Sequence, residues 1–291
     1  AVHVFGPAMA VDLLADLAGR FGETEGSVTD RAALAGAIAG SGAEAIITAA
    51  AYSAGRKGLM RSGDAENDKA MAVNVLGLQT LLEAARETGV GRVVWTSSTV
   101  VYGPAEAYTG RVDEDAPRAP VTFYGPTKVL GEDIARNHRD RHGPSVTGLR
   151  LPLVLGAGLW YAGAASAIAE VAAAARPGAR HAVRFHDAPM DLMHVADVAE
   201  AVVAALDPAR APRDVYNING FTAAMSDVAA TAERLVPGYR VEHTPEPAAI
   251  TFPLIDDGRF RRDAGFAPAH DLEAVVDAML SHRETSCTKS A

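Results

Sequence analysis

Short apolar runs alternate with longer amphipathic segments along the first half of the chain. The apolar runs fall at residues 2–5, 21–28, 45–51, 91–97 and 145–151. Such short runs, bounded by turn residues, predict strands that the fold buries. The segments that repeat apolar residues at helical spacing fall at residues 12–20, 30–39, 64–87 and 124–141. Strands and helices in this order predict an α/β fold of the Rossmann type, a doubly wound parallel sheet.

The second half of the chain has shorter elements that Pro and Gly interrupt. We expect helices at residues 163–175, 197–206, 226–235 and 272–280, and strands at residues 182–185, 190–194 and 215–218. The change in character predicts a sheet domain over residues 1–151. Residues 152–283 are then expected to form mainly a smaller lid, with some elements returning to the sheet, and residues 284–291 a tail.

Composition narrows the class of protein. The chain has 291 residues, 48% of them hydrophobic, and a net charge of -9, which argues against nucleic acid or an anionic membrane as a partner. No apolar run approaches the length of about 18 residues that a membrane span needs, and no secretory signal opens the sequence. The single cysteine, Cys287, lies in the polar tail, so the cytoplasm is the expected location.

The stretch from Val93 to Lys128 carries the candidate chemistry. A buried strand ends in Ser98, and Tyr124 and Lys128 follow, separated by three residues. Hydride transfer to or from an alcohol needs one group to exchange the hydroxyl proton and another to hold the oxygen. Tyrosine titrates near pH ~10, and a neighbouring ammonium lowers that value. On a helix, Tyr124 and Lys128 share one face.

The Tyr-x-x-x-Lys spacing alone has low specificity. With seven Tyr and four Lys, chance gives such a pair in about one chain in ten of this composition. A packed Tyr with a Lys reaching to solvent is the structural alternative. The hydroxyl that faces the site is also open at this stage, because Ser97 and Thr99 flank Ser98.

A set of landmarks in order resembles one family across nearly the whole chain. The landmarks are Asn74-Val-Leu-Gly77, Thr96–Gly103, Phe123–Lys128, Leu149-Arg150 through Gly156, Asp191–Val198, Tyr216-Asn-Ile218 and Gly265–Pro268. Together they resemble the extended short-chain dehydrogenase/reductases, the NAD-dependent epimerase/dehydratase family. The resemblance implies an enzyme with a dinucleotide-binding domain in residues 1–151 and a substrate-binding lid beyond it.

The resemblance also implies roles for individual residues. Tyr124 would be the catalytic acid/base, Lys128 would hold the nicotinamide ribose and favour the phenolate, and Ser98 would bind the reacting oxygen. The cofactor-binding residues implied are Ser27, Val28, Ala49, Ala50, Ala51, Asn74, Thr96, Tyr124, Lys128 and Pro152. Asn74 would support the active site as well.

The front of the chain departs from the family. Its members open with a strand, a Gly-x-x-Gly-x-x-Gly loop and a helix, whose backbone amides bind the pyrophosphate. No such run occurs here, and Val2–Phe5 resembles the family's second strand. We expect one β-loop-α unit of roughly 30 residues to be missing from this sequence; the alternative is a protein without that loop. Gly6 stands where an acidic residue usually binds the adenine ribose of NAD, which weakens the preference for NAD over NADP. The front of the chain has no Arg cluster that would favour NADP, so NAD is expected and NADP stays an alternative.

The substrate signature also departs from that of sugar-nucleotide enzymes. Pro152-Leu153 replaces their aromatic-Asn pair, Met190 replaces an Arg, and Thr99-Val100 replaces the Asp-Glu of dehydratases. Dehydration is therefore not expected. The candidate substrate-side residues are Thr99, Tyr102, Leu153, Trp160, Tyr161, His186 and His194. For the aromatic and histidine side chains among them, packing in the core is the alternative.

No metal site is expected. His138 and His142 are four residues apart and could chelate an ion, but their position at the C-terminal end of a helix indicates a complement to the helix dipole. By analogy with the family, residues 64–87 and 124–141 would pair two subunits in a homodimer.

Three functional hypotheses follow. The first is an NAD(P)-dependent oxidoreductase that interconverts a secondary alcohol and a ketone on a small, sugar-like substrate through Ser98, Tyr124 and Lys128. The second is a sugar or nucleotide-sugar epimerase that uses the same residues and returns the hydride. The third is a non-catalytic binding or regulatory protein that lacks the phosphate-binding loop.

Overall fold

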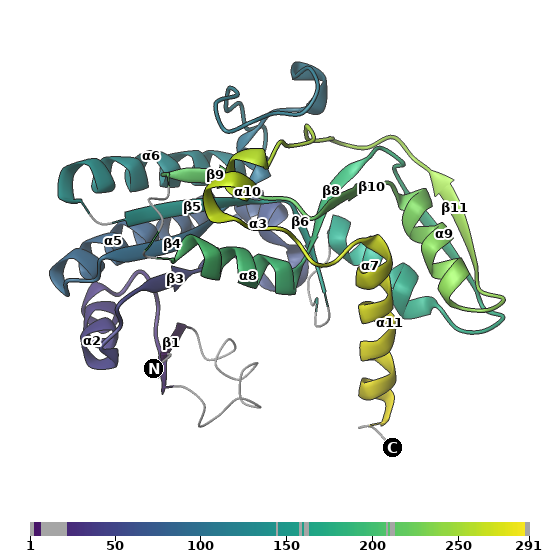
Figure 1. Cartoon of the computed structure of the whole chain (residues 1–291), viewed down its shortest axis with the longest axis horizontal. Coiled ribbons are helices and arrows are strands. Elements are labelled where there is room, and N and C mark those ends of the chain that lie inside the picture. Colours follow the sequence, from purple (N-terminus) through teal and green to yellow (C-terminus); the bar gives the residue numbers. More distant parts are fainter. Residues whose placement is uncertain are drawn as a thin grey trace.

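A four-stranded parallel sheet forms the centre of the larger part of the molecule (Figure 1). The computed structural model describes residues 3–6, 22–143, 145–156, 159, 163–207, 209 and 213–288. The sheet has the order β3-β4-β5-β9, with bounds Ile46–Thr48, Arg92–Ser98, Ser145–Leu151 and Val215–Asn217. β4 and β5 pair along their full length, from Arg92 with Ser145 to Ser98 with Leu151. β1 (His3–Gly6) and β2 (Gly22–Glu25) form a separate parallel pair.

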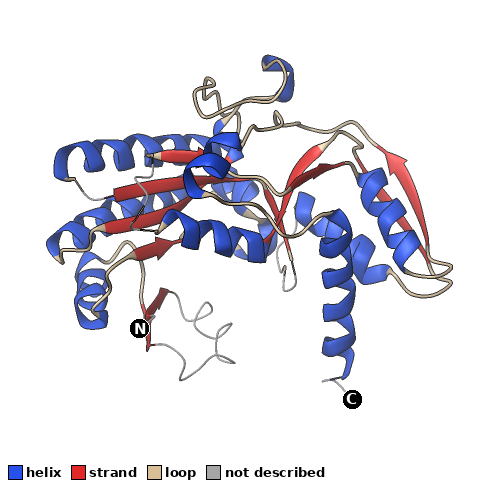
Figure 2. Ribbon diagram, in the orientation of Figure 1, coloured by secondary structure: helices blue, strands red, loops and turns tan. Residues whose placement is uncertain are grey.

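Helices cover both faces of this sheet (Figure 2). Their bounds are α2 Arg31–Ser41, α5 Gly77–Glu87, α6 Tyr124–His142, α8 Val195–Ala205 and α10 Gly258–Ala264. Successive side chains of β4 point to opposite faces. Val93 and Trp95 pack with α2, α5 and α6, whereas Val94 packs with α8 and α10. This arrangement confirms the predicted doubly wound α/β fold.

The expected long helix over residues 64–87 is interrupted. α3 (Leu59–Ala65) ends at Glu66, α4 (Asn67–Met71) follows, and a π-helical turn at Ala72–Leu76 leads into α5. The periodicity of the apolar residues could not reveal this π turn, because one wide turn shifts the register by a single residue. The expected helix at residues 12–20 lies outside the described residues.

The C-terminal elements form a second packed cluster around α7 (Ala164–Ala174), α9 (Met225–Leu235) and α11 (Leu272–Thr288). Its strands are β6 Leu153–Leu155, β7 Arg180–Phe185, β8 Met190–His194, β10 Phe221–Ala223 and β11 Arg240–Pro245. β6 and β8 are parallel, β10 is antiparallel to β8, and β7 pairs with β11. α8, β9 and α10 return to the sheet, while the proposed domain boundary after residue 151 stays a prediction.

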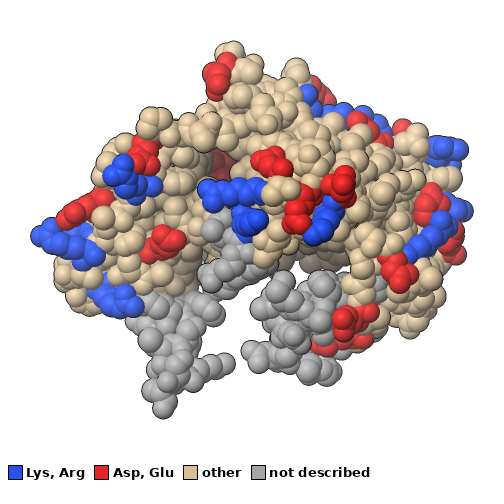
Figure 3. All heavy atoms as spheres, turned by 180° about the vertical axis from the view of Figure 1, so that it is seen from behind, with Lys and Arg blue, Asp and Glu red and all other residues tan. Residues whose placement is uncertain are grey.

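Among the described residues, no helix combines the length and the apolar character that crossing a membrane requires. On the face seen in Figure 3, basic and acidic side chains alternate and do not separate into patches of one sign.

Candidate active site

The end of β4 and the start of α6 hold the three predicted catalytic residues. Ser98 is the last residue of β4, and its Oγ accepts a hydrogen bond from the Val100 amide at 3.4 Å. Tyr124 is the first residue of α6, and Lys128 follows one turn later. The start of α6 is held from outside the helix, since the Phe123 amide donates to Oδ1 of Asp64 at 2.8 Å.

Lys128 is a buried cation beside two aromatic rings. Its side chain is 2% exposed, and its Nζ donates to the Thr96 carbonyl at 2.7 Å. The ammonium lies 5.4 Å from the centre of the Tyr124 ring and 5.6 Å from that of Trp95. Burial lowers the pKa of Lys128 to about 8, while the nearby Glu132 carboxylate opposes that shift. A positive charge held in this position favours the phenolate form of a neighbouring tyrosine.

Glycines make room for Trp95 beside this lysine. A Cβ at Gly131 of α6 or at Gly148 of β5 would come within 3.0 Å of the indole. Trp95 therefore fills the space between helix and sheet, and its Nε1 is buried with no hydrogen-bond partner among the described residues. The indole forms an apolar wall next to Lys128.

Asn74 connects the π turn to α6. Its Nδ2 donates to Oγ1 of Thr127 at 3.0 Å, and its Oδ1 accepts the Tyr52 amide at 2.7 Å. Thr127 Oγ1 in turn donates to the Tyr124 carbonyl at 2.7 Å. π turns occur often at functional sites, because they redirect a side chain out of the helical register. Here the turn directs Asn74 toward α6 and toward the loop after β3.

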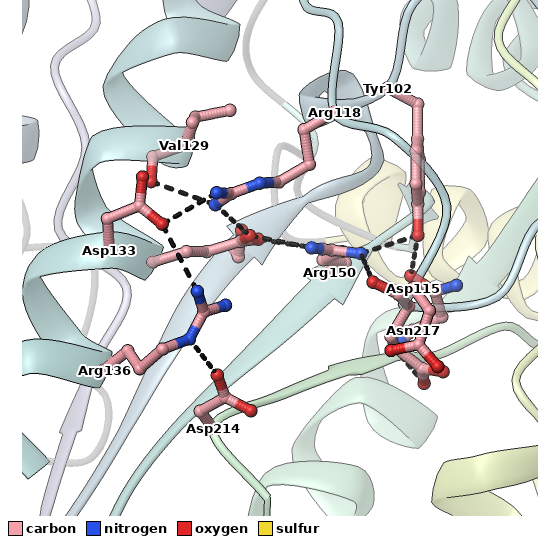
Figure 4. A network of polar contacts seen from close by, with 12 residues as sticks. Tyr102, Asp115, Arg118, Val129, Asp133, Arg136, Arg150, Asp214 and Asn217 are labelled. Carbon is pink, nitrogen blue, oxygen red and sulfur yellow. Dashed lines mark hydrogen bonds and ion pairs between the residues drawn. The ribbon is translucent and has the colours of Figure 1, made fainter. Parts of the chain in front are cut away.

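A buried polar network supports the site from behind. Both oxygens of Glu132 accept from Arg150 at 2.8 Å, and Oε1 also accepts from Oγ of Ser97 at 2.7 Å. Arg150 donates to the Tyr102 hydroxyl at 2.7 Å, which donates to Oδ1 of Asn217 at 2.9 Å (Figure 4). The network joins β4, α6, β5 and β9, so it fixes the strand end relative to the catalytic helix.

This network narrows the choice among the candidate hydroxyls. Ser97 points into the network and is buried, whereas Ser98, on the opposite face of β4, and Thr99 are half-buried. Tyr102, a predicted substrate residue, is fully buried, and burial raises its pKa to about 12. Its place in the network favours a structural role over contact with substrate.

A pocket in front of Lys128 gathers five of the predicted cofactor residues. It is lined by Val28, Thr48, Ala50, Val73, Asn74, Gly77, Leu78, Trp95, Thr96 and Lys128. An ammonium has three donors and the bond to Thr96 uses one, so Lys128 keeps donors for a ligand. The accessible space is about 10 Å³, no more than one water molecule needs, so contact of these residues with a nucleotide stays a prediction. Lys128 is the single charged group among these described lining residues, and none of them forms a phosphate-binding loop.

The remaining cofactor predictions lie around this pocket without lining it. Ala49 and Ala51 are in the loop after β3, and Ser27 is exposed in the turn before α2, where its Oγ pairs with Oγ1 of Thr29 at 2.8 Å. Pro152 is buried directly after β5. Their contact with cofactor stays a prediction.

The predicted substrate residues are dispersed. Leu153 packs on the C-terminal cluster, and the His186 ring stacks on Phe185 at 4.3 Å. His194 precedes α8, and its ring lies 4.3 Å from that of His270. Trp160 and Tyr161 lie outside the described residues.

Sequence reasoning missed the residues that hold the catalytic groups in place. Asp64 caps the start of α6, and Glu132 and Arg150 form the buried pair behind the site. One signal was available, since Glu132 follows Lys128 by four residues and therefore shares its helix face. The partner of Glu132 could not be read from spacing, because Arg150 lies on the next strand.

Comparisons with known proteins show the family of the chain. Residues 9–219 match the NAD dependent epimerase/dehydratase family. The match covers well over half of the 291 residues, so the chain belongs to that family, as its motifs indicated. NAD is thereby confirmed as the cofactor of the family to which the chain belongs.

Individual relatives include both dehydrogenases and epimerases. UDP-glucose 4-epimerase of Azospirillum brasilense is 31% identical over an alignment of 231 residues, and the alignment covers 72% of this chain and 65% of that protein. Mitochondrial L-threonine 3-dehydrogenase of Bos taurus is 27% identical over 228 residues, 75% of this chain and 61% of that protein. The chain thus spans less than two thirds of the length of these two curated relatives. The structure of L-threonine dehydrogenase from Clostridium difficile has a TM-score of 0.82 at 18% identity and covers 98% of both chains, which confirms the fold.

Proposed function

We propose that the protein is an NAD-dependent oxidoreductase that interconverts a secondary alcohol and a ketone on a small substrate. The observation that supports this best is the buried ammonium of Lys128, 5.4 Å from the ring of Tyr124 and bonded to the Thr96 carbonyl. Burying a cation is costly, and a buried lysine whose pKa falls to about 8 is typical of a functional site.

Each residue has a separate task in the proposed reaction. NAD, when bound, supplies the hydride acceptor. The phenolate of Tyr124, which the ammonium of Lys128 stabilises, takes the hydroxyl proton of the alcohol and becomes the neutral phenol, while Ser98 donates to the substrate oxygen. Asn74 and Thr127 hold the first turn of α6, and with it Tyr124, in place. In the direction of reduction the same tyrosine returns the proton.

Replacement of the tyrosine tests this assignment. Tyr124→Phe removes only the hydroxyl, so it should lower turnover by about 10²–10⁴-fold, as removal of a general acid–base group does. NAD binding, measured by calorimetry, should survive. Ser97→Ala is a matched control, because it removes a hydroxyl that faces the buried network, and its turnover should fall much less than that of Tyr124→Phe. Near-normal turnover of Tyr124→Phe would contradict the proposed role, and a wild-type chain that binds neither NAD nor NADP would favour the non-catalytic hypothesis.

Epimerisation is the second candidate function, since the relative at 31% identity is a UDP-glucose 4-epimerase. Both reactions begin with the same proton transfer to Tyr124. They differ in outcome, because a dehydrogenase releases reduced cofactor and an epimerase gives an isomer without net oxidation. Assays with L-threonine and with UDP-glucose, scored for both NADH and isomer, distinguish the two and test the sugar-like substrate as well.

We further propose that the protein works in the cytoplasm as a homodimer paired through α5 and α6. Support comes from two large exposed apolar side chains, Leu76 at the end of the π turn that leads into α5 and Leu130 of α6, which are 54% and 41% exposed. Leu130→Glu should therefore give a monomer in light scattering. A wild-type chain that is monomeric at micromolar concentration would contradict the proposed pairing.

A further inference from the structure

A groove between α5 and α6 contains metal-binding side chains that the proposed reaction does not use. Glu83 of α5 and His138 and His142 of α6 each offer one ligand atom, and the three atoms lie within 4.8 Å of one another. All three line the same groove. We propose that they bind one divalent transition metal ion of the zinc type per chain.

The geometry matches a known form of chelate. His138 and His142 are one helical turn apart, with ring centres separated by 4.8 Å, and two histidines at this spacing on one helix face are a recurrent zinc-binding pair. The third ligand comes from the neighbouring helix, where Oε1 of Glu83 lies 3.6 Å from Nδ1 of His138. Arg86 holds Oε2 of Glu83 at 3.0 Å, so the other oxygen is the one near the histidine.

The donor set selects the class of ion. Two imidazole nitrogens and one carboxylate oxygen suit Zn²⁺, Co²⁺ and Ni²⁺ better than Ca²⁺ or Mg²⁺, which prefer oxygen ligands. Three protein ligands leave one tetrahedral position for water.

His138 argues against the simpler reading as a complement to the helix dipole. That reading needs an imidazole near solvent at the helix end, but His138 is only 6% exposed. Its Nε2 is buried and has no hydrogen-bond partner among the described residues. Hydrogen bonds within the described part of the protein therefore do not explain why this imidazole is buried. An imidazole that packing holds in place beside a carboxylate is preordered for a metal ion.

The site is remote from the catalytic residues. His138 follows Tyr124 by fourteen residues on one helix, which corresponds to about 21 Å. An ion bound here would join α5 to α6 at the ends away from Asn74 and Tyr124. Its role is to hold the two helices together, and it takes no part in proton or hydride transfer.

Calorimetry with Zn²⁺ on the full, tag-free chain, stripped of metal beforehand, tests this proposal. We expect one ion per chain, and Co²⁺ should give the visible absorption of a tetrahedral site. His142→Ala should weaken Zn²⁺ binding about tenfold or more. Because His142 is exposed, this change leaves no cavity in the core. Turnover of His142→Ala should stay normal, so failure of the metal proposal is separable from failure of the proposed function.

Three control variants make the result specific. Arg141 lines the same groove but is not a proposed ligand, so Arg141→Ala should bind Zn²⁺ normally. His270→Ala breaks the other close histidine pair, His194 with His270, and should also bind normally. Leu130→Glu, expected to be monomeric, should retain Zn²⁺ if one chain supplies all three ligands. The proposal is wrong if the wild type binds no Zn²⁺, if His142→Ala binds as the wild type does, or if His270→Ala or Leu130→Glu loses the ion.

Discussion

The two sides of the candidate site are built very differently. Behind Tyr124 and Lys128, β4 and β5 are seven residues long, pair along their whole length and enclose the network around Glu132 and Arg150. On the other side, β3 has three residues, is an edge strand of its sheet among the described strands, and leaves Ile47 54% exposed. The proton-transfer groups are thus fixed by the interior, whereas the pocket wall at β3 depends on a short edge. Mutations should therefore disturb the two sides by different amounts.

The largest effect is expected from breaking the buried ion pair. Glu132→Ala leaves the guanidinium of Arg150 buried and unpaired, which typically costs about 3–5 kcal/mol of unfolding free energy. Urea denaturation of the variant measures this cost. Asp133→Ala is the matched control at the next residue. Because Asp133 is exposed, this replacement should lower the unfolding free energy by no more than about 1 kcal/mol. Equal losses in the two variants would show that the network is not what holds this side together.

A smaller effect is expected where the start of α6 meets the loop before it. A Cβ at Gly125 would lie 2.4 Å from that of Pro120 and 2.6 Å from the Val100 carbonyl oxygen. Gly125→Ala should therefore destabilise the protein by about 1–3 kcal/mol. Gly36→Ala in α2 has nothing within 4 Å and should stabilise by about 0.5–1 kcal/mol through helix propensity. Differential scanning calorimetry should show opposite shifts of Tm, and shifts of the same sign would refute the close contact at Gly125.

The buried ammonium should appear in the pH dependence of stability. The pKa of Lys128 is about 8 in the folded chain and near 10.4 when unfolded, so between these values the unfolded chain binds the extra proton. Stability from this group is lowest below pH 8 and rises with pH across that window. The unfolding free energy of the wild type should gain about 1–2 kcal/mol between pH 7.5 and 9.5 relative to Lys128→Met. If the difference in unfolding free energy between the wild type and Lys128→Met stays constant or falls over this pH range, the result would contradict a buried, protonated lysine.

The smallest effect is expected at the exposed edge. Ile47→Thr keeps a β-branched side chain at a half-exposed position, so the unfolding free energy should change by less than about 0.5 kcal/mol. Val94→Thr on the neighbouring strand buries a hydroxyl and should cost about 1–3 kcal/mol. A loss at Ile47 as large as that at Val94 would show that another surface covers this edge in solution.

Much of this organisation could be predicted from the sequence. Periodicity placed α2, α6, β4 and β5 within a few residues, and α2 begins after Asp30, whose side chain accepts from the Ala33 amide at 3.0 Å. Tyr124 and Lys128 could be paired because both lie on one helix, where spacing determines the face. These features are local, so a linear pattern is enough to find them.

Features that depend on packing could not be predicted. The roles of Ser97 and Ser98 separate only when Glu132 is placed under β4, because both are hydroxyls at a strand end. Glu83 reaches His138 only through the packing of α5 on α6, and from sequence alone the two histidines looked like helix-end residues. The buried contact of Tyr102 with Asn217 joins residues that are 115 positions apart. No periodic pattern contains that information.

The place of Trp95 also gives the protein an optical probe of its own. The chain has two tryptophans, and Trp160→Phe would leave Trp95 as the sole indole. Its buried ring lies 5.6 Å from the Lys128 ammonium and lines the pocket that gathers five of the predicted cofactor residues. Fluorescence from this one residue should change as Lys128 loses its proton and again as NAD enters. Charge state and occupancy of the site can then be followed in solution without an added label.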